Sequence, residues 1–330
     1  MMRTSVSGKM MLLPVQGKAC IGNTIGVAPD HNTLIGVGIV KLRPIKATNN
    51  VCSAAVSVRD PKLLDRSTKI QHAKPKRFAT KRIACDRTTI CNKPEQLFDC
   101  DIFVFVASRG IPPVGSQVKD VRMAQFELNA AIVKQYARMA RKAGFKGQWC
   151  AVSDPVDPLA KTAYLESNKD ENGVWDGKGL RPEQVQGFGL GVMNARAAYY
   201  AKRDDRFASF LTEGRSFGPH GTGLTIANSI EHYDDALSQE LTHLTVTANL
   251  KMREIGFKPY VAPALSSGAL SILLTLRGEW HCGSVFLDGI YMGVKNRYTP
   301  AGIETELLPH IPDALYGHIV DAAEHLKEVL

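Results

Sequence analysis

Asp101-Ile-Phe-Val-Phe-Val-Ala107 is a continuous apolar run in which polar and apolar side chains do not alternate. Such a run predicts a strand that is covered on both faces, as in a parallel sheet. A loop over residues 108–120 follows, and apolar side chains at three- and four-residue steps then predict a helix that Asp120 caps and Gly144 ends. A second strand over 148–152 completes a crossover unit, which we expect to be right-handed.

Two polar segments follow the carboxyl ends of these strands, the loop 108–120 and the turn Ser153-Asp-Pro-Val-Asp-Pro158. Ligands of open α/β sheets bind at the carboxyl ends of the strands, so we expect the functional site there. The sequence therefore predicts an α/β fold built on a doubly wound, Rossmann-type parallel sheet.

The composition is that of a globular protein in a reducing compartment. The 330 residues are 44% apolar, and we expect neither a secretory signal nor a membrane span. Seven cysteines without a CxxC pair argue against a disulfide framework, so we expect free thiols and a cytoplasmic location. The net charge of +9 includes basic clusters at residues 74–82 and 138–146, but no known nucleic-acid motif accompanies them. We interpret them as a basic surface, with neither nucleic acid nor membrane as a partner.

The first hundred residues carry a weaker signal. Gly17 and Gly22 lie in a turn whose backbone N–H groups could face a pyrophosphate, although the spacing is not GxGxxG and ordinary turn glycines are the alternative. Residues 34–40 are more typical of a strand that contains two glycines. At Arg59-Asp60, the end of a further predicted strand, the aspartate would suit the ribose hydroxyls of NAD and the arginine the 2′-phosphate of NADP. Both cofactors stay open.

Beyond the turn at 153–158 the pattern becomes mixed. It predicts helices over 159–167, 192–203, 230–255, 263–276 and 312–330, a strand over 210–217, and a hairpin over 284–294 that turns at Asp288-Gly289. We expect a dinucleotide-binding domain at residues 1–158 and a mixed α+β, substrate-binding domain at 159–330.

Four segments occur in a recognisable order: Val104-Phe-Val-Ala-Ser-Arg-Gly110 with Asp120-Val-Arg122 and Asn129, then Val152-Ser-Asp-Pro-Val-Asp157, Gly191-Val-Met-Asn-Ala-Arg196 and Gly218-Pro-His-Gly221. Together they resemble the L-lactate/malate dehydrogenase family. The second segment is similar to the family's VSNPVD, the third to G-x-x-D-S-A-R and the fourth to G-x-H-G. The resemblance runs from about residue 100 to the end of the chain.

This resemblance implies a reversible hydride transfer between NAD or NADP and a 2-hydroxy/2-oxo acid. His220 would be the general acid and base, because imidazole titrates near neutrality. Arg196 would grip the substrate carboxylate with two parallel hydrogen bonds, and Arg122 would polarise the carbonyl. Asp154 and Ser266 complete the expected substrate contacts. The expected cofactor contacts are Gly17, Gly22, Ala107, Arg109, Asn129, Val152 and Asp154.

The chain departs from the family at three places. Asp154 replaces an asparagine, and its charge would repel an anionic substrate unless the substrate carries an amine or the carboxyl is protonated. Met193 replaces the aspartate that orients the histidine, and the adjacent Asn194 is an uncharged substitute. The loop between Gly115 and Arg122 is longer, so the residue that selects the substrate side chain is sought within 111–117.

Two functions are therefore open: a malate- or lactate-dehydrogenase-like oxidoreductase with an atypical site, or a catalytically degenerate protein that binds a nucleotide or metabolite and acts in regulation or interaction. Retention of His220 with two arginines favours the enzyme, which would act on a small molecule and assemble as a homodimer or homotetramer, as family members commonly do. Which 2-hydroxy/2-oxo acid it uses is not determined by the sequence.

Overall fold

The structure is a computed structural model that describes residues 97–108, 123–254 and 262–329, together with three short strands before them, β1 (Cys20–Ile21), β2 (Gly38–Val40) and β3 (Thr89–Ile90). Several residues that the sequence singles out lie outside this described part: Gly17, Gly22, Arg59, Asp60, Arg109, Asp120 and Arg122.

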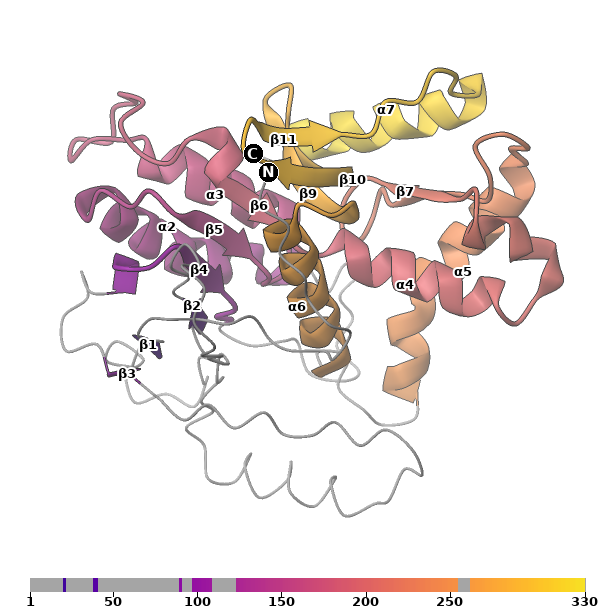
Figure 1. Cartoon of the computed structure of the whole chain (residues 1–330), viewed down its shortest axis with the longest axis horizontal. Helices are drawn as coiled ribbons and strands as arrows, with labels where there is room; N and C mark the ends of the chain where they lie inside the picture. The colour runs from indigo at the N-terminus through magenta and orange to yellow at the C-terminus, as the bar shows by residue number, and fades with distance from the viewer. Residues whose placement is uncertain are drawn as a thin grey trace, which may run out of the picture.

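A seven-stranded sheet forms the centre of the described fold, in the order β11-β10-β9-β6-β5-β4-β2 (Figure 1). Its middle strands run parallel: β4 (Ile102–Phe105), β5 (Gln148–Ala151) and β6 (Val185–Gly187). The antiparallel strands β9 (His281–Leu287), β10 (Ile290–Thr299) and β11 (Gly302–Thr305) extend one edge, and β2 joins the other edge antiparallel to β4. All four residues of β4 are buried, as its apolar run predicts. The predicted α/β class is confirmed.

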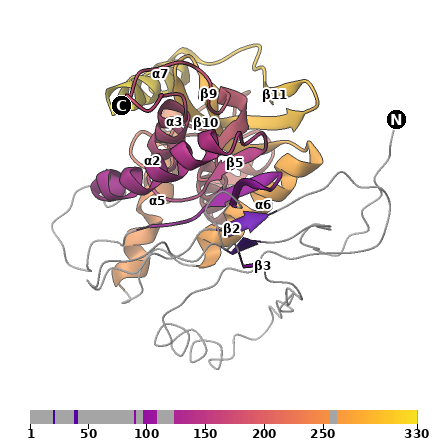
Figure 2. The ribbon, with the colours of Figure 1, turned by 90° about the vertical axis from the view of Figure 1, so that its left-hand side faces the viewer.

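Helices cover both faces of this sheet (Figures 1 and 2). On one face, α2 (Phe126–Lys142) and α3 (Val156–Ser167) pack against fully buried aromatic side chains such as Trp149. On the other face, α6 (Ala262–Arg277) packs Ile272 against the strands. The short helix η2 (Met123–Gln125) leads into α2, which ends before Gly144 at φ 62°, so β4, α2 and β5 form the predicted crossover unit.

Most of the other elements lie on the side of β9 and β10 (Figure 1), where β7 (Arg215–Phe217) and β8 (Thr225–Ala227) form a separate two-stranded sheet. A second apolar core lies among α4 (Leu190–Ala201), η4 (Asp205–Leu211) and α5 (Asp235–Glu254). A third lies among β7, β8, β10 and α7 (Asp313–Glu328). The short helix η3 (Pro182–Gln184) precedes β6.

Two predicted elements begin about five residues too early. The strand predicted over 210–217 is wrong in its first part, because the chain up to Leu211 forms η4. Phe207 and Phe210 are both buried, and a three-residue spacing suits a 3-10 turn. Helix α5 begins at 235 instead of 230, because the Asn228 side chain accepts a hydrogen bond from the Asp234 N–H and holds a turn there.

The predicted hairpin is confirmed. Strands β9 and β10 pair antiparallel, and the turn residues Asp288 and Gly289 have φ angles of 46° and 84°. Positive φ at both positions is the requirement of a type I′ turn, which an Asp-Gly pair satisfies.

The central sheet takes strands from both sides of residue 158, since β4 and β5 share it with β6 and β9. The domain boundary at 158 stays a prediction. Among the described residues, no helix has both the length and the apolar character needed to cross a membrane.

Candidate active site at the carboxyl edge of the sheet

His220 lies in the loop between β7 and β8, where its contacts include Asp157, Gly189 and Asp154. Its backbone N–H donates to Asp157 Oδ2 over 3.0 Å, and its ring Nδ1 lies 2.8 Å from the carbonyl oxygen of Gly189. A carbonyl oxygen can only accept, so Nδ1 carries a hydrogen. The third contact is at the other ring nitrogen, Nε2, which lies 3.7 Å from Asp154 Oδ1. The side chain is only 8% exposed.

The glycine at 189 is what allows the ring to approach the chain so closely. A Cβ atom at this position would lie 2.6 Å from His220 Cβ and 2.9 Å from Val156 Cγ2, both closer than real contacts. Gly187, two residues earlier, is packed as tightly, against Val156 and Ser284. The glycines of this segment therefore serve the contact between β6, α3 and the histidine loop.

Asp154 lies in the turn after β5, and its backbone is fixed. Its carbonyl oxygen accepts a 2.7 Å hydrogen bond from Asn129 Nδ2 on α2. In the same turn, the Ser153 hydroxyl donates over 2.6 Å to the carbonyl oxygen of Ala107, which follows β4. The side chain of Asp154 is 36% exposed, so its carboxylate faces His220 on one side and solvent on the other.

Asp157 is the buried member of this group and belongs to the first turn of α3. Burial raises the pKa of Asp157 from its usual value of 3.8 to about 6, and the Ser284 hydroxyl and the His220 N–H partly oppose this rise. The sequence motifs did not single out this residue for the site. A signal was present, since Asp157 is a lone carboxylate between the apolar residues Val156 and Leu159 of a helix start.

Met193 and Arg196 lie on α4, three residues apart. Met193 is fully buried in the core beneath this helix, and Arg196 Nη1 lies 3.7 Å from its sulfur. Arg196 itself is half-buried. The Asn194 side chain accepts a 3.0 Å hydrogen bond from the Ser216 hydroxyl, so its oxygen is bound to β7. The partner of His220 Nδ1 is thus a backbone carbonyl, which cannot be recognised from the identity of any residue in the sequence.

The structure brings together only some of the residues that the sequence proposes for the site. His220, Asp154 and Asn129 meet at the carboxyl edge of β5, together with the strand-end residues Ala107 and Val152. Ser266 lies in α6, but its side chain is outside the described part, as are the whole of Arg109 and Arg122.

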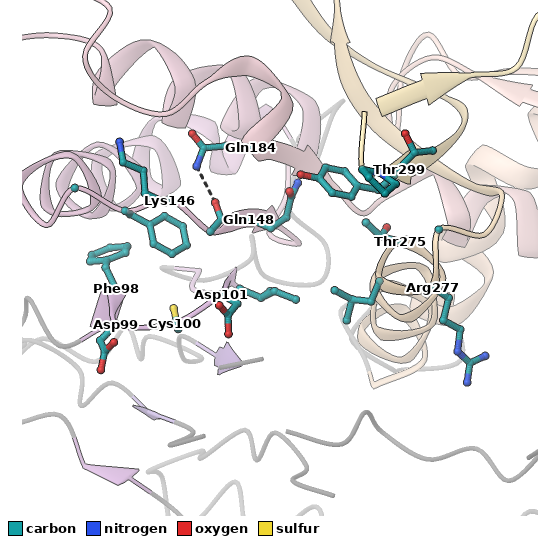
Figure 3. Close-up of a pocket in the computed structure, with 18 residues that line it drawn as sticks. Phe98, Asp99, Cys100, Asp101, Lys146, Gln148, Gln184, Thr275, Arg277 and Thr299 are labelled. Carbon is teal, nitrogen blue, oxygen red and sulfur yellow. Dashed lines mark hydrogen bonds between the residues drawn. The ribbon is translucent and has the colours of Figure 1, made fainter. Parts of the chain in front are cut away.

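A hollow of about 840 Å³ lies at the opposite edge of the sheet (Figure 3). It is bounded by the amino ends of β4, β5 and β6 and by the end of α6. Figure 3 shows Asp99 and Asp101 on one wall and Arg277 extending away from them, while Gln184 donates to the carbonyl oxygen of Gly147. Its described lining includes no histidine, and ligands of such sheets bind at the carboxyl ends, so we place the candidate site at His220.

No protein-family model matches this chain, and no curated protein is similar to it in sequence. Solved structures are similar in fold. The malate dehydrogenase from Aeropyrum pernix has a TM-score of 0.60 and 18% identity, over 81% of this chain and 83% of that one. The fold is that of the malate and lactate dehydrogenases.

Two further structures support the same fold. The malate dehydrogenase from Archaeoglobus fulgidus, in complex with NADH, has a TM-score of 0.56 and 16% identity, over 74% of this chain and 80% of that one. A lactate dehydrogenase from a Medee basin deep-sea metagenome has a TM-score of 0.55 and 18% identity over the same shares. Malate/lactate-dehydrogenase-like architecture is therefore present at a sequence identity too low to carry an activity with it.

Proposed function

We propose that this chain is an oxidoreductase that transfers a hydride between NAD or NADP and a 2-hydroxy/2-oxo acid. The observation that carries the proposal is the seating of His220 at the carboxyl edge of the sheet, where a carbonyl fixes Nδ1 and Nε2 faces a partly exposed carboxylate. A ring held in this way can exchange a proton at one defined nitrogen. The fold it shares with malate and lactate dehydrogenases supports the same reaction class.

His220 would move the proton of the reaction. In the reducing direction, the charged ring gives the hydrogen on Nε2 to the substrate carbonyl oxygen while the carbonyl carbon receives the hydride. In the oxidising direction, the neutral ring takes the hydroxyl proton at the same nitrogen. Because the Gly189 carbonyl keeps a hydrogen on Nδ1 in both states, only Nε2 changes.

Two arginines would handle the substrate's negative charge. Arg196 is proposed to bind the substrate carboxylate, since a guanidinium can donate two parallel hydrogen bonds to it. Arg122 is proposed to polarise the carbonyl oxygen, and Ser266 to contact the substrate from α6. These three roles derive from the sequence resemblance.

The described strand ends fit a dinucleotide. Parallel β4 and β5 end side by side at Phe105 and Ala151, just before Ala107 and Val152. Gly268 of α6 lies so near Val152 that a Cβ there would be 3.3 Å from Cγ1. Small, uncharged residues at the strand ends allow a cofactor to approach the backbone. A bound nicotinamide cofactor would supply or accept the hydride. Ala107, Asn129, Val152 and Asp154 would line it, with Gly17, Gly22 and Arg109 proposed from the sequence.

The decisive experiment is dinucleotide binding, followed by turnover. Ligand at a hundred times its dissociation constant stabilises a protein by about 2.7 kcal/mol, so NADH or NADPH should raise the melting temperature by a few degrees. A panel of 2-oxo acids is then tested for NADH or NADPH oxidation. Failure of both dinucleotides to bind would refute the proposal, and binding without turnover on any acid would favour the alternative of a regulatory nucleotide-binding protein.

Arg196→Lys tests the substrate side of the same proposal. Lysine keeps the charge but loses the planar fork, so KM for the 2-oxo acid should rise by about tenfold or more. The thermal shift with NADH serves as the control and should be unchanged. An unaltered KM would remove Arg196 from its proposed role.

We also propose that the protein assembles as a homodimer or homotetramer and acts in the cytoplasm. Support comes from the family resemblance and from the lack of disulfide patterning in the sequence. Light scattering of the purified protein would measure its oligomeric state directly.

A further inference from the structure

The histidine of the candidate site has a carboxylate on an unexpected side. At residue 193, where the L-lactate/malate dehydrogenase family has an aspartate, this chain has a buried methionine. The carbonyl oxygen of Gly189 accepts from Nδ1 instead. Asp154, which stands where the family has an uncharged asparagine, brings its Oδ1 to 3.7 Å from Nε2.

This arrangement makes the two protonation states of His220 unequal. Nδ1 bears a hydrogen in both states, because its partner is a carbonyl. In the neutral ring, the lone pair of Nε2 therefore faces the Asp154 carboxylate, and the two negative regions repel each other. In the charged ring an N–H group faces the same carboxylate, and an opposite charge at this distance favours the charged form.

We propose that Asp154 is the positioning residue of His220: its carboxylate favours the charged ring from the Nε2 side and replaces the carboxylate that is missing at Met193. The effect on the ring follows from the described contacts. Its consequence for catalysis rests on the proposed function, in which the charged ring is the proton donor during carbonyl reduction.

The position of Asp154 suits this role. The bond from Asn129 Nδ2 to the Asp154 carbonyl oxygen fixes the backbone, so the carboxylate can approach the ring without loop movement. Its side chain is 36% exposed, whereas that of His220 is 8% exposed. A partly exposed carboxylate therefore lies beside Nε2 of the buried ring.

Two other titratable groups face His220 among the described residues. Asp157 binds the backbone N–H of His220, and not its ring. His325 of α7 lines the small cavity of about 30 Å³ that His220 shares with Asp157. These residues provide matched controls, because Asp157 contacts the backbone of His220 and His325 lines the same cavity.

The test is a titration of His220 by NMR, with the ring signals of the nine histidines recorded from pH 5 to pH 9 and His220 identified by its loss in His220→Asn. We expect Asp154→Asn to shift the His220 midpoint to lower pH, and Asp157→Asn and His325→Gln to shift it less. Asp154→Ser is the second variant if the asparagine form does not fold. An unchanged or raised midpoint in the Asp154 variant would overturn the proposal, and so would a larger shift in Asp157→Asn.

A kinetic measurement extends the test. If wild type reduces a 2-oxo acid, Asp154→Asn should move the alkaline fall of kcat/KM to lower pH. At a pH above the wild-type midpoint, kcat/KM of Asp154→Asn should be lower than that of wild type. The ratio should be about tenfold for each pH unit between the two midpoints. A gain in kcat/KM at every pH would mean that Asp154 only repels substrate, which also overturns the proposal. If no acid is reduced by any variant, the proposed function fails, while the NMR titration still decides the role of Asp154.

Discussion

His220 and His281 are both buried, and two consecutive residues after β6 hold them. The carbonyl of Gly189 binds the ring of His220, whereas the ring of Phe188 stacks on that of His281, with centroids 6.2 Å apart and an interplanar angle of 8°. The ring nitrogens of His281 lie 3.0 Å from the Thr275 hydroxyl and 3.3 Å from the Glu279 carbonyl oxygen. Both of these partners are uncharged, while Nε2 of His220 faces Asp154.

The difference separates a histidine of the core from a histidine suited to chemistry. Burial lowers the pKa of His281, and the hydrogen bond to the Glu279 carbonyl opposes this fall only in part. At His220, Nδ1 donates to a neutral acceptor and Nε2 faces a partly exposed carboxylate. Two equally buried histidines can thus have a structural or a chemical role, depending on the groups that contact their ring nitrogens.

Replacing each histidine by asparagine gives the largest expected contrast. An asparagine amide can occupy the place of Nδ1 but has no counterpart of Nε2. His220→Asn should therefore lose about 10²–10⁴-fold in kcat/KM for 2-oxo acid reduction, the usual contribution of a general acid. His281→Asn should leave kcat/KM within a few fold but lower the unfolding free energy by about 1–3 kcal/mol, through the lost hydrogen bond and ring stacking. Steady-state kinetics and urea unfolding of both variants measure the two effects.

The opposite pattern would break the contrast. Retained turnover in His220→Asn would show that the proton of any reaction comes from elsewhere. Lost turnover in a well-folded His281→Asn would mean that the ring beneath α6 contributes to the site through Phe188.

The second prediction concerns Asp157, the buried carboxyl beside His220. With a folded pKa of about 6 against 3.8 for the free group, Asp157 holds a proton in the folded state that the unfolded chain has lost between these values. Stability should therefore fall as pH rises from about 4 to 6, by about 3 kcal/mol, and stay lower above pH 6. Asp157→Asn cannot ionise, so the difference in unfolding free energy between wild type and variant should change by this amount. Parallel stability curves from pH 4 to 7 would refute the burial effect.

Much of the fold could be predicted, because in several segments the local residue pattern alone determines the secondary structure. The unalternating run at 101–107 gives a buried central strand, and the Asp288-Gly289 pair gives the hairpin turn. Residues 205–211 could not be assigned in this way, because the buried Phe207 and Phe210 are set by the core that they fill. Helix periodicity located α2, because its apolar spacing repeats over several turns, and Pro312 marked the start of α7.

Less of the candidate site could be predicted. His220 and Asp154 were selected through their motifs, but their approach depends on a loop after β7 meeting a turn after β5. The carbonyl of Gly189 had no signal of its own, because every residue has one. Asp157 was visible in the sequence as a carboxylate in an apolar helix start, yet its partner, a backbone N–H 63 residues away, was not.

The third prediction tests whether the segment between the two histidines is as tightly packed as it looks. Gly189→Ala would place a Cβ atom 2.6 Å from His220 Cβ, so the histidine loop must move. We expect a loss of about 1–3 kcal/mol, the usual cost of overpacking, with a fall in kcat/KM. Gly317→Ala on α7 is the matched control, because an added Cβ would meet nothing within 4 Å apart from its own helix backbone, and alanine is favoured in a helix by about 0.5–1 kcal/mol. Calorimetric melting temperatures that fall in both variants, or in neither, would contradict this interpretation.

The smallest expected effect is the acid sensitivity that His281 gives the region beneath α6. Burial lowers the pKa of His281 below its usual 6.5, so the unfolded chain takes up this proton first as pH falls. The neutral ring therefore contributes stability that is fully present above about pH 6.5 and is lost as pH falls towards the folded pKa. This slope is opposite in sign to that of Asp157 and overlaps with it between about pH 4 and 6, so wild type would show only their difference.

Measuring urea unfolding from pH 5 to 7.5 in Asp157→Asn isolates the histidine, and adding His281→Asn to that variant should remove the remaining fall on the acid side. If the double variant loses stability in acid as steeply as Asp157→Asn alone, His281 is not the group that titrates, and its neutral partners do not distinguish it from His220 in the way proposed.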